Sequence, residues 1–130
     1  QRAGITFHGP YTYADLPELY GRCDFAWSID WFEDGLNSFW LLPNRLYEAI
    51  TYGCVPIALD EVEVGRWLDD HKVGLCVDDA EDAKAQLLSM SRERASVLRA
   101  EVTRIDPSLT TATRADCKAL VARIEKLLPR

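Results

Sequence analysis

The chain has 130 residues, of which 48% are hydrophobic and 28% are charged, and its formal net charge is -6. This size and composition fit one domain with a real hydrophobic core and argue against extensive disorder. The negative charge argues against nucleic-acid binding, which needs a basic face. No apolar run is long enough to cross a bilayer, so we expect a soluble, cytoplasmic domain. Peripheral attachment of a longer enzyme to a membrane stays open.

Short apolar runs alternate with amphipathic patterns along the chain. The predicted strands are residues 5–8, 24–29, 54–59 and 74–77. The predicted helices are residues 16–23, 43–52, 62–70, 80–88, 95–105 and 117–128. Because strands and helices alternate, we expect an α/β fold with a Rossmann-like, mainly parallel sheet of about four strands and flanking helices. The almost wholly apolar run 54–59 suits a parallel strand covered on both faces.

The four cysteines do not form a recognisable metal or disulfide pattern. They lie far apart in apolar patterns without a CxxC pair, which predicts buried, reduced thiols. The two histidines, His8 and His71, lie in unrelated segments and do not resemble a ligand pair. The cysteines are Cys23, Cys54, Cys76 and Cys117.

The carboxyl ends of the strands form the predicted functional edge, because ligands bind there in open parallel sheets. The loop of residues 30–42 and the loop after Leu59 lie on this edge. Aromatic side chains in and beside the first loop serve either to stack on a base or sugar, or to pack in the core or under a partner domain. These aromatic residues are Trp27, Trp31, Phe32, Phe39 and Trp40.

The helix predicted from Pro43 has the features of an anion site. Proline is favoured in the first helical position, and the free N–H groups and positive dipole end of a first turn attract phosphate. Arg45 can add a forked, charged contact. Glu48, one turn further along, is placed to accept hydrogen bonds from vicinal hydroxyls such as those of a ribose. The alternative is an ordinary capped helix with a surface Arg45–Glu48 pair.

Residues 44–58, Asn-Arg-Leu-Tyr-Glu-Ala-Ile-Thr-Tyr-Gly-Cys-Val-Pro-Ile-Ala, closely resemble a known signature. It belongs to the C-terminal, donor-binding domain of glycosyltransferases with two facing Rossmann-like domains (GT-B type, group 1). Residues 5–9 and 16–24 resemble weaker motifs of the same domain, and the whole resemblance covers about residues 4–80. It implies transfer of a sugar from a nucleotide-diphosphate donor to a sugar or lipid-linked acceptor held by a further domain.

The resemblance also implies a set of substrate-binding residues. In many relatives a Glu-x7-Glu motif supplies two carboxylates, and Glu48 matches the second, ribose-facing one. Trp40 stands where the first would be, so Glu33, Asp34 or Asp30 would have to replace it. No catalytic base is assigned, and without an Asp-x-Asp motif we expect no metal and no cofactor besides the donor. The expected substrate-binding residues are Glu33, Pro43, Asn44, Arg45, Leu46 and Glu48.

The family's domain usually carries two further strand–helix units before the motif at residues 5–9. We therefore expect one partial domain over residues 1–130, with a core of residues 1–78 and C-terminal helices in residues 79–130, inactive by itself. Its open sheet edge would be closed by re-pairing of strands or by dimerisation. Two alternatives are a nucleotide-sugar epimerase on the same fold and a noncatalytic assembly module.

Overall fold

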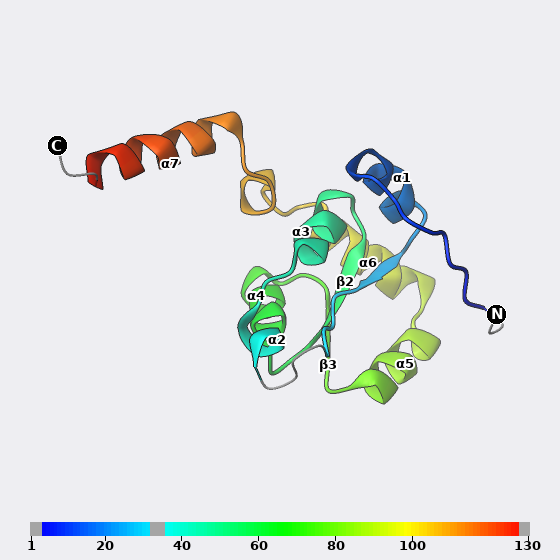
Figure 1. The fold of residues 1–130 in the computed structure, drawn as a ribbon. Coiled ribbons are helices and arrows are strands. Elements are labelled where there is room, and N and C mark those ends of the chain that lie inside the picture. Colours follow the sequence, from blue (N-terminus) through cyan, green and yellow to red (C-terminus); the bar gives the residue numbers. More distant parts are fainter. Residues whose placement is uncertain (1–3, 32–35, 128–130) are drawn as a thin grey trace.

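The computed structural model describes residues 4–31 and 36–127 as an α/β domain. Its sheet has three parallel strands in the order β1-β2-β3, and helices lie around it (Figure 1). The strands are β1 (Phe25–Trp27), β2 (Val55–Leu59) and β3 (Leu75–Val77). This arrangement confirms the predicted Rossmann-like class and the parallel pairing of the last three predicted strands.

The helices occupy most of the positions that the sequence predicts. One exception is the short helix α2, which lies in the predicted loop 30–42. The helices are α1 (Leu16–Gly21), α2 (Asn37–Trp40), α3 (Asn44–Thr51), α4 (Glu63–His71), α5 (Ala80–Ser89), α6 (Arg92–Val102) and α7 (Arg114–Leu127). Two 3-10 turns, η1 (Tyr13–Asp15) and η2 (Pro107–Leu109), precede α1 and α7.

The central strand β2 is the middle of the core. Its first four residues are buried, as the apolar run predicts for a strand covered on both faces. On one face, α3, α4 and α6 pack against it through a cluster that includes Leu46, Leu68 and Leu98. On the other face, Ile57 packs with β3 and with Ala83 of α5. The sheet and four helices therefore form one packed body.

The predicted first strand, residues 5–8, is wrong. This segment has no strand pairing, and its side chains are exposed, with Ile5 at 63% and Phe7 at 86%. An apolar run becomes a strand only where a neighbouring strand takes up its backbone hydrogen bonds, and β1 pairs with β2 alone among the described residues. The described residues therefore show three strands and no re-pairing. Dimerisation through the open edge stays a prediction.

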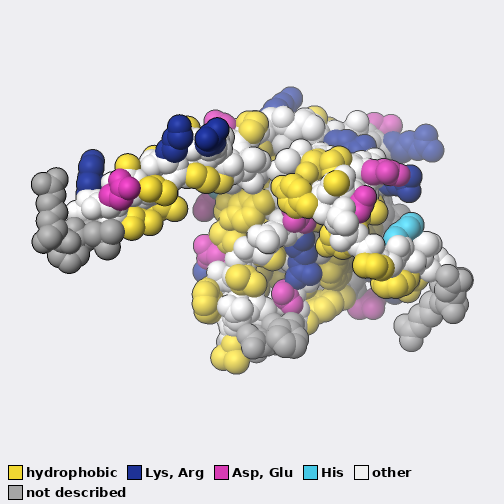
Figure 2. Space-filling model, turned by 45° about the horizontal axis from the view of Figure 1, so that its top comes forward, with side chains coloured by type: hydrophobic (Ala, Val, Ile, Leu, Met, Phe, Trp, Pro, Cys, Tyr) yellow, Lys and Arg dark blue, Asp and Glu magenta, His cyan; other side chains and the backbone are white. Residues whose placement is uncertain are grey.

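The C-terminal helices divide into two groups. The helix α6 is part of the core, because Leu98 and Val102 are each 1% exposed and Arg99 donates to the carbonyl of Cys23. The helix α7 projects from the body, as Figure 1 shows, and has no buried residue. Figure 2 shows hydrophobic side chains along it beside Lys and Arg. No helix in the described ranges is long and apolar enough to span a membrane.

The four cysteines are all free. Cys54 is buried and Cys76 is half-buried, and loss of water raises the pKa of both thiols, that of Cys54 to about 11. Cys23 and Cys117 are exposed, so the prediction of buried thiols is wrong for these two. Cys23 follows the end of α1, and Cys117 lies on the projecting α7, where no second layer covers the apolar pattern.

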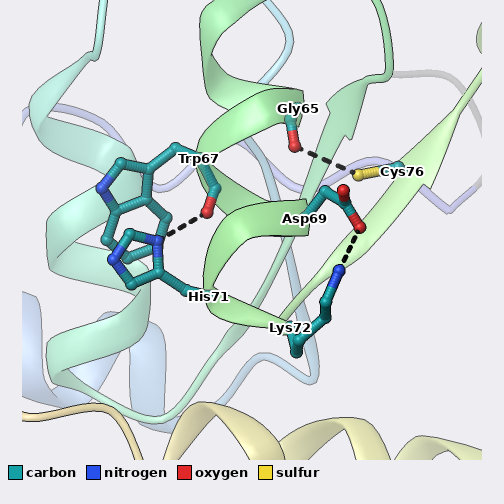
Figure 3. Close-up of polar contacts among 6 residues, drawn as sticks. All are labelled: Gly65, Trp67, Asp69, His71, Lys72 and Cys76. Atoms are coloured by element: carbon teal, nitrogen blue, oxygen red, sulfur yellow. Dashed lines mark hydrogen bonds and ion pairs between the residues drawn. The ribbon is translucent and has the colours of Figure 1, made fainter.

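The start of α4 lies directly against the end of β2 at Gly65. A Cβ on Gly65 would lie 2.1 Å from the carbonyl oxygen of Leu59 and 2.7 Å from that of Asp60. The Gly65 carbonyl accepts a hydrogen bond from the Cys76 thiol of β3, at 3.6 Å (Figure 3). Glycine at this position therefore sets how closely α4 approaches the sheet.

The turn after α4 has its own polar contacts. His71 Nδ1 lies 2.8 Å from the carbonyl oxygen of Trp67, and the two rings stack (Figure 3). Lys72 takes a left-handed conformation with φ 56°, and its ammonium lies 2.8 Å from Asp69. These contacts end α4 before β3 begins.

We predict that Gly65→Ala destabilises the domain by about 1–3 kcal/mol, because the added methyl group overpacks the junction of α4 and β2. Urea unfolding followed by circular dichroism measures the change. The matched control is Gly21→Ala at the end of α1, where an added Cβ meets nothing within 4 Å. The control should change stability by less than about 1 kcal/mol. Equal stability of the two variants would contradict the close packing at Gly65.

Candidate functional site

The helix α3 begins one residue later than the sequence predicts. Pro43 is extended, with φ -76° and ψ 151°, and acts as the N-cap, so Asn44 is the first helical residue. Proline still fits, because its ring imposes this φ. The helix ends at Thr51, one residue before the predicted end at Tyr52, and Gly53 follows the C-cap with a φ of 73°. The amides of Asn44 and Arg45 therefore lead the helix, and first-turn amides have no acceptor within the helix.

Arg45 faces the carboxyl edge of the sheet. Its guanidinium lies 3.1 Å from the carboxylate of Asp30, which follows β1, and the two side chains are 38% and 32% exposed. The Nε atom of Arg45 is buried and has no hydrogen-bond partner among the described residues. The start of α3 therefore lies beside the predicted functional edge. Arg45 pairs with Asp30 rather than with Glu48, unlike in the ordinary surface-helix alternative.

A small cavity lies between Asp30 and the start of α3. Its volume is about 10 Å³, and Ser28, Ser38 and Pro43 are among the residues that line it. Ser28 is buried, and its hydroxyl has no hydrogen-bond partner within residues 4–31 and 36–127. A cavity of this size accommodates about one water molecule, so it is too small for a nucleotide or a sugar.

A larger hollow, of about 460 Å³, runs along the outer side of α3. We call it the α3 hollow. Two of the expected binding residues, Asn44 and Glu48, lie on its wall, one helical turn apart. Binding sites for small molecules have volumes of about 300–1,000 Å³, and the volume of the α3 hollow lies within this range. The lining residues are Tyr13, Asn44, Tyr47, Glu48, Thr51, Tyr52, Thr110, Thr111 and Ala112.

Tyr20 of α1 holds the Glu48 carboxylate in place. Its phenol donates a hydrogen bond to Glu48 Oε2 at 3.1 Å, and its ring stacks on Tyr52 with centroids 5.9 Å apart. Burial, and next the charge of Glu48, raise the pKa of Tyr20 well above its ordinary 10.0. The phenol therefore stays neutral and keeps donating at physiological pH. A half-buried carboxylate with one fixed donor is held in one orientation toward a ligand.

The remaining expected residues lie elsewhere. Leu46 is fully buried in the core, where it holds α3 on the sheet and is out of reach of a ligand. Pro43 lines the small cavity rather than the α3 hollow. Glu33 and Asp34 lie outside the described residues, as does Phe32.

The aromatic residues around the 30–42 loop do not form one core. Trp27 and Trp31 contact each other with ring centroids 5.6 Å apart, and both are exposed. The guanidinium carbon of Arg66 lies over the Phe39 ring, 5.6 Å from the ring centroid, and Trp40 is exposed. Their exposure agrees better with cover by a partner or ligand than with core packing.

The sequence did not single out the tyrosines and threonines of the α3 hollow. Tyr20 belongs to the weaker motif at residues 16–24, and its spacing to Glu48 carries no local pattern because the pair is 28 residues apart. Thr110 and Thr111 lie still further along the chain, between η2 and α7. Thr51 lies one turn after Glu48 on the same side of α3. This spacing is the only local pattern in α3 that could have predicted Thr51 as part of the site.

We predict that Tyr20→Phe changes how stability depends on pH. Because the folded pKa of Tyr20 is raised, the stability from its neutral phenol is fully present below about pH 10 and is lost as the pH rises further. Tyr20→Phe should lower the free energy of unfolding at neutral pH by about 1–2 kcal/mol and flatten its fall above about pH 10. Urea unfolding from neutral pH to above about pH 11 measures both effects.

Tyr47→Phe is the matched control, because it removes a phenol from the α3 hollow and keeps the Tyr20–Glu48 hydrogen bond. It should retain the pH dependence of the parent chain. Identical pH profiles for Tyr20→Phe and the parent would contradict the role given to the phenol.

Comparison with known proteins shows the family to which this fold and site belong. The glycosyl transferase-like family matches residues 1–117, which include β1, α3 and the whole α3 hollow. Succinoglycan biosynthesis protein ExoL of Rhizobium meliloti (strain 1021) is 40% identical over 126 residues, 95% of this chain and 31% of that protein. The chain thus spans about a third of the length of this curated relative. No solved structure matches it significantly. The resemblance inferred from residues 44–58 is confirmed: the chain belongs to the glycosyl transferase-like family.

Proposed function

We propose that this chain is the donor-binding part of a glycosyltransferase of the two-domain, GT-B type. It would bind a nucleoside diphosphate sugar whose sugar passes to a sugar or lipid-linked acceptor held elsewhere in the enzyme. The observation that carries the proposal is the Glu48 carboxylate, held by Tyr20 on the wall of a hollow that begins at the first turn of α3. Membership of the family supports sugar transfer, and the relative is named for succinoglycan biosynthesis.

The diphosphate would lie at the start of α3. The leading amides of this helix point toward an approaching anion, and the helix dipole adds positive potential there. Arg45 can supply a forked contact to phosphate oxygens. Its present partner, Asp30, is about a third exposed, and ion pairs at such positions are weak. A diphosphate carries more negative charge than one carboxylate, so it can replace Asp30 as the partner of Arg45.

The ribose would lie one turn further along α3. Asn44 and Glu48 are four residues apart, which is about 6 Å along a helix axis and comparable to the step from a phosphate to the ribose hydroxyls. The Glu48 carboxylate can accept hydrogen bonds from two vicinal hydroxyls. The Tyr20 bond fixes its orientation beforehand, which lowers the cost of ordering it on binding.

Catalysis would rest on stabilising the departing diphosphate. Negative charge grows on its oxygens as the glycosidic bond to the donor sugar breaks, and preorganised amides and a guanidinium stabilise that charge. We propose no metal and no catalytic base among the residues of this chain. The chain alone would bind the donor without completing the transfer.

We predict that calorimetric titration with UDP, GDP, ADP and dTDP detects binding of at least one nucleotide. Glu48→Ala should weaken that binding by about 1–3 kcal/mol, the range for loss of a charged hydrogen bond. Glu48→Gln should also weaken it while keeping an acceptor for Tyr20, which separates lost recognition from lost folding. The control is Glu81→Ala, which removes an exposed carboxylate of α5. No binding by any of the four nucleotides would contradict the proposal, and unchanged affinity in folded Glu48 variants would remove Glu48 from the site.

A further inference from the structure

The far end of the α3 hollow, beyond Glu48, has a composition that the diphosphate and ribose contacts do not explain. Aromatic rings enter it from two directions: Tyr13 comes from η1, and Tyr52 follows the end of α3. Threonine hydroxyls form its other wall, where Thr51 donates to Thr110 at 3.2 Å. Thr111 continues this wall toward α7. Flat apolar faces next to small hydroxyls suit a planar ligand that has hydrogen-bonding groups on its edge.

The direction of α3 places this end where the next part of a nucleotide would lie. The diphosphate is proposed at Asn44 and the ribose at Glu48, so the ligand extends toward the C-terminus of the helix. Tyr52 lies four residues after Glu48, which is about 6 Å further along the axis. A base is joined directly to the ribose and therefore reaches the level of Tyr52 and Thr110. The opposite direction leads back to the start of α3, where Arg45 and Asp30 lie.

Tyr13 and Tyr52 offer neutral aromatic rings for stacking rather than charged groups for ionic contact. Tyr52 is half-buried and stacks on Tyr20, with an angle of 21° between the rings. Partial loss of water, and then the neighbouring phenol of Tyr13, raise the pKa of Tyr52 above its ordinary value, so it stays neutral. Tyr13 is 77% exposed and lines the mouth of the hollow. An exposed aromatic ring at a mouth gains contact area when a flat ligand covers it.

We propose that Tyr13, Tyr52, Thr110 and Thr111 form the subsite for the nucleobase of the donor. The rings contact the flat faces of the base, and the threonine hydroxyls, which both donate and accept, meet its polar edge. This inference rests on the proposed donor binding and deepens it, because it assigns base selection to residues outside the signature at 44–58. It also links the base to the segment that leads into α7.

The test compares two ligands that differ by the base alone. The nucleoside diphosphate that binds best among UDP, GDP, ADP and dTDP is titrated beside ribose 5-diphosphate, into the parent chain and into Tyr13→Ala and Thr111→Val. Both substituted side chains are exposed, so the fold should persist, which circular dichroism checks. Tyr13→Ala should weaken the nucleotide at least about fivefold, the lower end of the effect of base–aromatic stacking. Neither variant should change the affinity for ribose 5-diphosphate.

Saturation-transfer NMR gives a second measurement on the same samples. Base protons of the bound nucleotide should receive strong saturation from the tyrosine rings in the parent chain and lose most of it in Tyr13→Ala. Unchanged nucleotide affinity and unchanged base saturation in both variants would overturn the base subsite while donor binding at Glu48 stands. An equal loss for both ligands would also overturn it, because the residues would then act on the ribose or the fold. Absence of binding by every nucleotide would overturn this inference together with the proposed function.

Discussion

The packing of α3 on the central strand β2 is the constraint on which the rest of the site depends. Leu46, Ala49 and Ile50 are buried on one side of the helix and fix its rotation about its own axis. That rotation decides the rest: Arg45 reaches Asp30 at the sheet edge, while Asn44 and Glu48 line the hollow on the outer side. An eight-residue helix has too few hydrogen bonds to be stable alone, so burial of this apolar side also sustains the helix itself.

The second constraint is the approach of other elements to α3. The helix α1 brings Tyr20 to Glu48, although the two residues are far apart in the sequence. The segment after η2 brings Thr110 to Thr51. The outer side of α3 thus gains walls from both ends of the chain, and a short surface helix becomes one side of a concave site. The core therefore fixes the position of α3, and peripheral segments form the walls of the hollow around it, as is typical of a binding domain.

The sequence predicted what depends on local pattern. The apolar run of β2, the amphipathic side of α3 and the glycine that ends it were placed within about a residue, because each follows from periodicity or from a backbone that only glycine adopts easily. The prediction of a strand at residues 5–8 is wrong because a strand requires a neighbouring strand to pair with, and an apolar pattern does not specify one. Glu48 could be named from the signature, but its hydrogen bond to Tyr20 and the threonine wall arise from tertiary contacts. Leu46 belongs to the same signature but packs in the core. A motif therefore does not tell which of its residues contact a ligand and which pack in the core.

In the proposed function α3 is the element that receives the donor, and an amide-resolved NMR titration tests this most directly. Unlabelled nucleoside diphosphate is added to the isotope-labelled chain, and the backbone amide shifts are followed residue by residue. We expect saturable shifts at the amides of Asn44, Arg45 and Glu48 and along the α3 hollow, and no shifts in α5. Shifts confined to other surfaces, with the first turn of α3 unaffected at saturation, would contradict it.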